Sequence, residues 1–262
     1  MKKFFCVLLV FCIIALVCSA QTESQPADSA ENTAVYEFFK SYDLELVTIP
    51  FENYTIKMLS TEVIQKLYKD IVGANQSSFK GDRRPVDSIS WYDAIYFCNL
   101  LSYKLGLQPV YLVDGTPDVA AWKYKPHSGR KITKEIIQNP QANGVRLPVL
   151  KEWMTAAFAG EDTEFAGSNN IDEVGWHGYN ASYRTHDVAE KKPNAYGLYD
   201  MTGNVLEWVW EQAGNHAGNN LVCGGCWGMY ASGCKITDIY RYPTNSRENI
   251  IGFRIVLLTD FE

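Results

Sequence analysis

The half of the chain beyond Glu161 constrains the fold most, because regular periodicity disappears there. Gly, Asn, Trp and Tyr crowd together in this half, and only short runs such as 252–258 have the pattern of a strand. The half before it contains a few short helical patterns. With 262 residues, of which 47% are apolar, the chain can bury enough surface to fold without a disulfide or a metal. These features predict an irregular α+β body with few helices and short strands.

Two helices are marked by their caps. The first is expected over 61–72, with Thr61 as the N-cap. The second begins after Ser90, which stands with Asp93 at the spacing of a capping box, and it ends before Gly106. Apolar residues recur at helical spacing in both segments, so each helix should pack one face on the core.

A third, shorter helix is expected over 149–159, where the chain enters through Pro148 and Trp153 points inward. The segment 36–57 has no helical pattern of this kind, and we expect it to be strand-like and irregular.

The N-terminus has the pattern of an export signal. Two lysines precede an apolar run over 4–18, and small residues follow it, which predicts a signal peptide over 1–20. Residues 21–34 are polar and predict a linker. No break divides the rest, so 35–262 is expected to be one domain. The protein is thus predicted to be exported to the periplasm or cell surface.

Cys18 is a candidate for a lipid anchor, although 15–17 read Ala-Leu-Val and depart from the usual lipoprotein pattern. Membrane attachment is expected only through such an anchor. The net charge of −6, with no Lys/Arg-rich run after the N-terminus, argues against nucleic acid as a partner.

The most specific motif is NAYGLYDMTGNVLEW, at 194–208. It closely resembles the GLYDMxGNVxEW signature of the formylglycine-generating enzyme, or sulfatase-modifying factor, family. Other family motifs follow in the same order along the chain: Pro85-Val86, Ser90 to Ala94, Phe97 to Asn99, Asn143 to Pro148, Glu152-Trp153, Gly224-Gly225 and Gly252 to Arg254. The resemblance implies a C-type-lectin-like fold, which hosts both enzymes and binding proteins.

The resemblance also implies where an oxidase active site would lie. Formylglycine-generating enzymes carry two copper-binding cysteines, five residues apart, after a Gly-Gly turn. In this chain the second falls on Cys234, but the first falls on Met229. A thioether cannot become a thiolate, and a pair of thiolates is what captures Cu(I). We therefore expect neither copper nor catalysis. An oxidase that converts a substrate cysteine to formylglycine, with Cys234 as its catalytic thiol, stays the alternative.

Four cysteines remain after the signal peptide, and the sequence does not choose among their pairings. They are Cys98, Cys223, Cys226 and Cys234. In an exported protein they allow three complete pairings. A bond between Cys223 and Cys226 needs a bend at the two intervening glycines. A bond from either of these to Cys234, across the loop, stays open.

The family signature also implies a structural calcium site. The matching positions are Asp200, Gly203, Val205 and Glu207. Hard cations require several oxygens from a tight turn, which two carboxylates and two carbonyl groups would supply. In the alternative interpretation, the two carboxylates only satisfy buried backbone donors and Arg254.

The segment 228–251 has the composition of a binding surface. It is rich in Tyr, Ser, Thr, Asn and Gly, as antibody paratopes are. In retroelement-diversified relatives this stretch carries the variable binding residues. The candidate ligand-binding residues are Trp227, Met229, Tyr230, Ser232, Thr237, Asp238, Tyr240, Tyr242, Asn245 and Asn249, with Trp176 and Tyr179 as neighbours. In the alternative interpretation they are inert polar loops.

The sequence therefore predicts an exported cell-envelope binding protein, whose ligand is an extracytoplasmic protein or a glycan. Two alternatives remain open. One is the formylglycine-generating oxidase acting on sulfatase cysteines, and the other is a structural component of the envelope that has no ligand.

Overall fold

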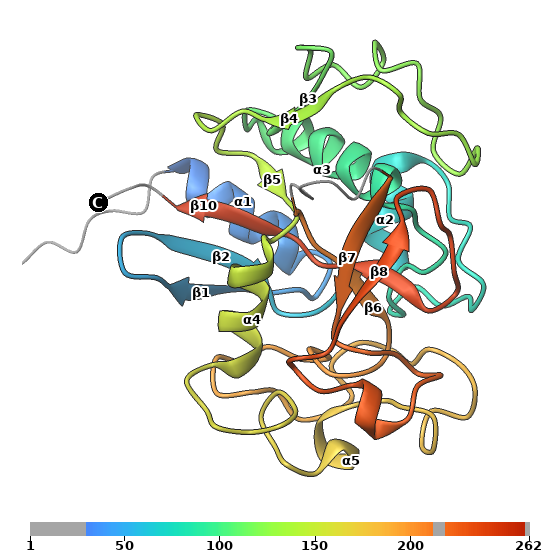
Figure 1. The fold of residues 1–262 in the computed structure, drawn as a ribbon. Helices are drawn as coiled ribbons and strands as arrows, with labels where there is room; N and C mark the ends of the chain where they lie inside the picture. Colours follow the sequence, from blue (N-terminus) through green and yellow to red (C-terminus); the bar gives the residue numbers. More distant parts are fainter. Residues whose placement is uncertain (1–29, 212–217, 260–262) are drawn as a thin grey trace, which may run out of the picture.

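Two four-stranded sheets and several short helices make up the computed structural model, which describes residues 30–211 and 218–259 (Figure 1). The helices are α1 (Ala30–Lys40), α2 (Gln65–Val72), α3 (Trp91–Leu105), α4 (Leu150–Phe158) and α5 (Ile171–Val174), with a 3-10 turn at Ala231–Gly233. The expected signal peptide over 1–20 and the anchor candidate Cys18 lie outside the described residues. No helix of the described part is long and apolar enough to cross a bilayer.

The two sheets differ in where their strands come from. The first joins the two ends of the domain, in the order β1 (Leu46–Pro50), β2 (Thr55–Leu59), β10 (Val256–Thr259) and β5 (Val145–Arg146). The second has the order β8 (Ile239–Pro243), β7 (Asn219–Cys223), β6 (Leu206–Trp208) and β9 (Ile251–Phe253), with β6 and β9 parallel. A separate two-stranded antiparallel sheet consists of β3 (Tyr111–Val113) and β4 (Ile136–Gln138). Few helices and short strands are what the sequence predicts.

The second predicted helix, α3, has the predicted caps. The Ser90 side chain accepts a hydrogen bond from the Asp93 amide, and the Asp93 side chain accepts one from the Ser90 amide. Gly106 ends the helix at a φ of 77°, in the left-handed region that glycine adopts without strain. The third predicted helix is α4, and Trp153 is fully buried on it. Both helices are therefore confirmed.

The first predicted helix begins later than expected, at Gln65 rather than at Thr61. Thr61 caps nothing: it is buried, and its hydroxyl donates to the Glu62 carbonyl. The backbone here is already paired, because the Val63 amide donates to Phe253 and its carbonyl accepts from Val86. Long-range pairing thus delays the start of the helix by one turn.

Helix α1 corrects two expectations. It covers the first part of the segment 36–57, which was expected to be strand-like, and its residues 30–34 belong to the expected linker over 21–34. Val35 and Phe39 are spaced four apart and both are buried in the main core, which explains why a helix forms here. Strand β1 lies within the rest of the segment, and strand β2 begins within it and ends two residues beyond it.

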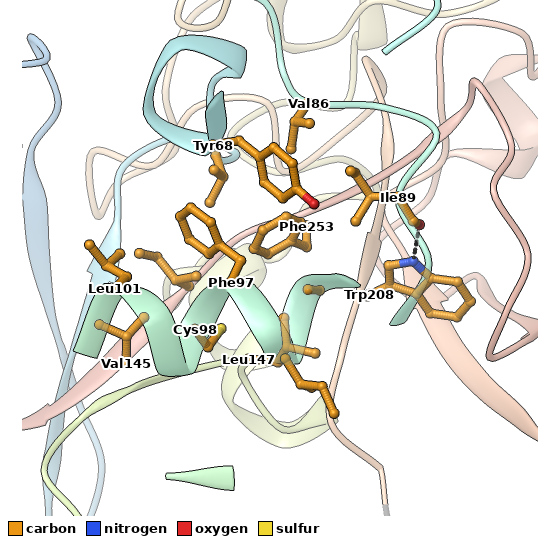
Figure 2. Close-up of a cluster of buried hydrophobic side chains, with 14 of the residues drawn as sticks. Tyr68, Val86, Ile89, Phe97, Cys98, Leu101, Val145, Leu147, Trp208 and Phe253 are labelled. Carbon is orange, nitrogen blue, oxygen red and sulfur yellow. Dashed lines mark hydrogen bonds between the residues drawn. The ribbon is translucent and has the colours of Figure 1, made fainter. Parts of the chain in front are cut away.

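The main core lies between α2, α3 and the strands β6 and β9. Figure 2 shows Tyr68 and Phe253 meeting Phe97 of α3, with the Phe97 ring centroid 5.4 Å from that of Tyr68 and 5.3 Å from that of Phe253. Trp208 donates its indole N–H to the Ile89 carbonyl at 2.8 Å, so the polar atom of this large side chain is satisfied inside the core. Cys98 faces the same core, as its helical position predicts.

Between α4 and β6 the chain forms only the single turn α5, together with loops (Figure 1). These loops, yellow to orange in Figure 1, gather at one end of the molecule with the 3-10 turn that follows β7. Loops placed on a rigid scaffold are where proteins concentrate binding residues. The candidate surface is therefore built here.

Candidate binding surface

The family signature forms the turn on which the loops rest. Gly203 has a φ of 83°, and a Cβ at this position would lie 2.8 Å from the Trp176 amide nitrogen. Both the conformation and the space therefore require glycine. Asn204 follows with a φ of 54°, in a region that Asn tolerates better than most residues. The signature thus brings the chain into direct contact with the loop that begins at Trp176.

Asn204 ties three loops together. Its amide donates to the Trp176 carbonyl at 2.8 Å, and its carbonyl accepts from the Trp227 amide at 2.9 Å. Its side-chain oxygen accepts from the His186 amide at 3.0 Å. Asn204 is fully buried, so these bonds are shielded from water. The loops that start at these three residues are therefore held in a fixed arrangement.

An aromatic stack reinforces this base. The His186 ring lies parallel to the Trp176 ring, with centroids 3.7 Å apart and planes 11° apart. The Lys191 ammonium lies 4.1 Å from the Trp176 ring centroid, within the range of a cation–π contact. Trp176, expected as a neighbour of the binding surface, therefore acts here as a support for its loop.

Two exposed tyrosines meet where the loops converge. The Gly178 amide donates to the Met229 carbonyl at 2.7 Å, and this bond brings the two following residues together. Tyr179 and Tyr230 have ring centroids 5.2 Å apart at an angle of 32°. Their exposed fractions are 80% and 65%. We refer to Tyr179 and Tyr230 as the tyrosine pair.

Only some of the other predicted ligand-binding residues face solvent. Ser232 and Thr237 are exposed on the segment that follows Tyr230. Asp238 is half-buried, and its carboxylate accepts from the Lys235 amide. These three residues lie between Tyr230 and the start of β8, so they are on the same loop segment as half of the tyrosine pair.

Tyr240 and Tyr242 lie differently from what their composition suggested. Both are half-buried on β8 and pack against the main core, and Tyr240 donates its hydroxyl to the Gly233 carbonyl at 2.9 Å. The alternation of the strand points Ile239 and Arg241 outward instead. The amino-acid composition of 228–251 does not reveal this alternation, because the sequence did not predict the strand β8.

The remaining candidates are also engaged. The Trp227 indole donates to the Asn249 carbonyl at 3.0 Å, and the Met229 side chain is half-buried against the core. Asn245 is two residues beyond the end of β8, and its carbonyl accepts a hydrogen bond from Arg247. Because β8 is five residues long, Asn245 lies roughly 15 Å along the strand from Asp238. The structure therefore does not gather all ten candidates at one place.

The cysteine expected at an oxidase site is not activated. Cys234 is fully buried, and burial raises the pKa of its thiol to about 12. Burial also raises the pKa of Cys226 to about 11 and that of Cys223 further still. All four cysteines within the described residues are free. Since the reactive form is the thiolate, these buried thiols are unreactive at neutral pH.

The residues expected to hold calcium have other partners. Glu207 accepts from Arg254 and, at 2.7 Å, from the Trp153 indole, so both its oxygens are engaged. Asp200 uses one oxygen for the Ala189 amide at 2.8 Å, and its other oxygen is buried without a partner. Glu207 therefore does not fit a calcium shell in this arrangement, although Asp200 does. The observed contacts are those of the alternative interpretation.

The backbone turn that would supply the two carbonyl ligands is present. Gly203 lies within it at a left-handed φ, and Val205 is fully buried directly before β6. No group of three or more His, Cys, Asp or Glu side chains in the described ranges converges as a metal site. Calcium binding stays a prediction.

Sequence reasoning missed a buried acid beside this turn. Glu62 is fully buried, and neither of its side-chain oxygens has a hydrogen-bond partner. Burial and the nearby Asp200 and Glu207 carboxylates raise the pKa of Glu62 well above its usual value, while Arg254 lowers it. Burial likewise raises the pKa of Asp200, to about 6. Only the fold reveals this proximity, because Glu62 is far from the signature in sequence.

Known proteins resemble the chain over most of its length. Residues 20–258 match the Sulfatase-modifying factor enzyme 1-like domain family. The Chaperone protein LppX of Paenibacillus barcinonensis is 35% identical over 238 residues, which cover 80% of this chain and 81% of that protein. The Formylglycine-generating enzyme of Thermomonospora curvata is 35% identical over 91 residues, which cover 28% of this chain and 30% of that enzyme.

Two solved structures share the fold. Treponema denticola variable protein 1 superposes with a TM-score of 0.73 at 28% identity, over 82% of this chain and 95% of that chain. CarF superposes with a TM-score of 0.70 at 27% identity, over 83% of this chain and 99% of that chain.

Proposed function

The chain belongs to the sulfatase-modifying factor enzyme 1-like family, and we propose that it is a non-catalytic member that binds an extracytoplasmic protein through the tyrosine pair. The proposal combines export, predicted from the N-terminus, with a surface built by the family signature. The observation that carries it is the pairing of Tyr179 with Tyr230 across the Gly178–Met229 hydrogen bond.

The tyrosine pair has the properties of a binding contact. Two large rings are exposed and in contact with each other, so they form a contiguous aromatic patch rather than a single exposed ring. Tyrosine loses little conformational entropy on binding, and it offers both an apolar ring and a hydroxyl. The backbones beneath the rings are fixed by Asn204, so little ordering is needed when a ligand binds.

A relative that aligns over most of the chain supports a protein as the ligand. LppX is named a chaperone protein, and chaperones act on other proteins. The solved structure with a similar fold is named a variable protein, a description that suits a binding scaffold more than an enzyme. We therefore favour a protein ligand over a glycan.

The oxidase alternative has less support. Met229 occupies the position of the first copper-binding cysteine, and the thiol of Cys234 is buried and protonated at neutral pH. A single protonated thiol offers neither the paired thiolates that bind Cu(I) nor a nucleophile.

The test is capture of a partner by the tyrosine pair. The chain from residue 21 is immobilised and exposed to the extracytoplasmic proteins of its own cells, in parallel with a Tyr179→Ser/Tyr230→Ser variant. The matched control is Tyr103→Ser, which removes a tyrosine that is 47% exposed on α3. A protein retained by wild type and by the control, but not by the double variant, is then purified and titrated.

We expect each single Tyr→Ser change to weaken binding of the purified partner about 10-fold, as at other tyrosine-rich interfaces. Retention that is equal in the double variant would reject the tyrosine pair as the binding surface. Binding that is lost after glycosidase treatment of the partner would instead identify a glycan ligand. Stoichiometric retention of an envelope protein that neither variant affects would support the structural-component alternative.

The oxidase is tested separately. The protein is incubated in air, with and without Cu(I), with a peptide that contains a sulfatase-type Cys-x-Pro-x-Arg motif, and the peptide mass is followed. We expect no change. Conversion of the cysteine to an aldehyde, abolished by Cys234→Ser, would establish the oxidase.

A further inference from the structure

We propose that Cys226 and Cys234 are an oxidative modification site, at which the two side chains form an intramolecular disulfide beneath the tyrosine pair. The inference stands on the geometry of the two cysteines. It does not depend on whether the tyrosine pair binds a protein.

The backbones of the two segments touch at Gly225. A Cβ at Gly225 would lie 2.7 Å from both the Cα and the Cβ of Cys234, a distance that real Cβ atoms do not reach. Gly225 has a φ of 72°, so glycine is needed here for conformation as well as for space. Cys226 is the residue after Gly225. Because consecutive Cα atoms are about 3.8 Å apart, the Cα of Cys226 lies close to this contact.

The Cys234 sulfur is directed toward Cys226. Its Sγ lies 3.9 Å from the Cys226 carbonyl oxygen. The 3-10 turn at Ala231–Gly233 returns the chain to this position, and the Cys234 amide donates to Ala231 at 3.0 Å. Tyr240 holds the turn through its bond to the Gly233 carbonyl. The return of the chain is therefore fixed before any covalent bond is made.

The other two cysteines face elsewhere. Cys223 lies opposite Glu207 in the sheet and packs with Trp153. Cys98 is on α3 and, like Cys226, belongs to the main core. By contrast, Gly225, the neighbour of Cys226, is in direct contact with the Cα and Cβ of Cys234. Of the three pairings that the sequence leaves open for Cys234, this geometry favours Cys226.

The reaction is a thiol–disulfide exchange with a small-molecule or protein disulfide as the oxidant. One cysteine loses its proton and attacks a sulfur of the oxidant, whose S–S bond breaks and releases one thiolate. The second cysteine then loses its proton and attacks the mixed disulfide, which forms the Cys226–Cys234 bond and releases the second thiolate. The protein loses two protons and two electrons, and the oxidant is reduced to two thiols.

Burial determines when the bond can form. Cys234 is fully buried and Cys226 is 1% exposed, so an oxidant cannot reach them in the folded protein. Their raised pKa values also leave little thiolate for the attack. We therefore expect the bond to form while the chain folds in the presence of the oxidant.

The experiment refolds the reduced chain, from residue 21 on, in oxidised and reduced glutathione. The product is denatured without reductant, free thiols are alkylated, and disulfides are then reduced and labelled with a heavier alkylating reagent. We expect the heavy label on Cys226 and Cys234 and the light label on Cys98 and Cys223. Peptide mapping of the unreduced product should show the 226–234 crosslink.

Single variants keep the test decisive if one of them folds poorly. Cys226→Ala and Cys234→Ala should each leave the light label on the remaining cysteines, whereas Cys98→Ala should leave the crosslink unchanged. A product whose four cysteines all carry the light label, or a crosslink that involves Cys223, would overturn the proposal. Partner capture by the same oxidised and reduced samples is scored separately, so loss of binding and loss of the disulfide are distinguished.

Discussion

The guanidinium of Arg254 and the carboxylate of Glu207 form an ion pair that is almost wholly buried. Their nitrogen and oxygen atoms are 2.8 to 3.1 Å apart, and the side chains are 0% and 1% exposed. The remaining donors of Arg254 bond the carbonyl groups of Leu59 and Tyr199. The pair therefore joins the end of β2, the family signature and the strand region at the C-terminus.

Replacing only one partner of this pair should be severe. Arg254→Met leaves Glu207 buried with one indole donor, and we expect it to lower the free energy of unfolding by about 3–5 kcal/mol. Glu207→Gln added to Arg254→Met removes the unpaired charge and should recover part of the loss. Urea unfolding of the single and double variants measures both effects. Equal, additive losses would show that the two residues do not interact.

The buried acids should make the protein less stable as pH rises. The folded-state pKa of Asp200 is raised to about 6 and that of Glu62 is also raised, so the folded protein binds more protons than the unfolded chain between about pH 4 and pH 6. Stability therefore falls as pH rises through the folded-state pKa values. Glu62→Gln should be more stable than wild type near pH 8, with a smaller difference near pH 4.5. Parallel pH profiles would contradict this.

Calcium offers a direct test of two interpretations. The family resemblance predicts a calcium ion at Asp200 and Glu207, whereas the contacts of Glu207 leave it no free oxygen. If calcium binds as predicted, the melting temperature is higher in calcium than in EDTA; if Glu207 keeps Arg254 as its partner instead, the two melting temperatures are the same. A higher melting temperature in calcium that disappears in Asp200→Asn would establish the site, and it would mean that Glu207 exchanges Arg254 for the ion.

Replacing Asn204 should lower both the stability of the protein and its affinity for the partner. Asn204→Ala removes the acceptor for the His186 amide and places alanine at a φ of 54°, so we expect a loss of about 2–3 kcal/mol. Asn204→Gly relieves the backbone cost and isolates the lost hydrogen bond. Thermal unfolding measures stability, and titration with the captured partner measures the surface. Unchanged binding in both variants would show that the loops need no anchor.

The proposed disulfide should stabilise the protein by closing a short loop. A bond from Cys226 to Cys234 is expected to add about 2–3 kcal/mol through the reduced entropy of the unfolded chain. Urea unfolding of the oxidised and reduced forms measures this difference, and Cys226→Ala should show none. A less stable oxidised form would mean that the bond strains the turn at Gly225.

The sequence predicted correctly those helices whose ends are determined by interactions between residues close together in the chain. The capping box of Ser90 and Asp93 is complete within four residues, so α3 could be placed from sequence. Thr61 misled because the backbone of Val63, two residues later, is paired with Phe253 of β9 and with Val86, which the sequence does not show. Helix α1 was missed because it begins inside the polar segment predicted as a linker, and its core-facing residues Val35, Phe38 and Phe39 span little more than one helical turn.

The surface was predicted by composition, and composition does not report orientation. The composition of 228–251 predicts Tyr230, and Tyr179 is expected as its neighbour. Tyr240 and Tyr242 belong to the same tyrosine-rich segment but pack against the core. They lie on β8, a strand that was not predicted, and its alternation determines which way they point. The nearness of Glu62 to Asp200 depends on the whole fold, and no local pattern contains it.

Around Asn204, the groups that hold the loops in place are different from the side chains that the loops expose. Tyr230, Ser232 and Thr237 are exposed, whereas the hydrogen bonds that position their loops come from buried residues and backbone groups. Substitutions at these three positions should therefore alter recognition with little effect on folding. A scaffold of this kind can acquire new specificities by ordinary mutation, and a library randomised at these positions should consist mostly of folded proteins.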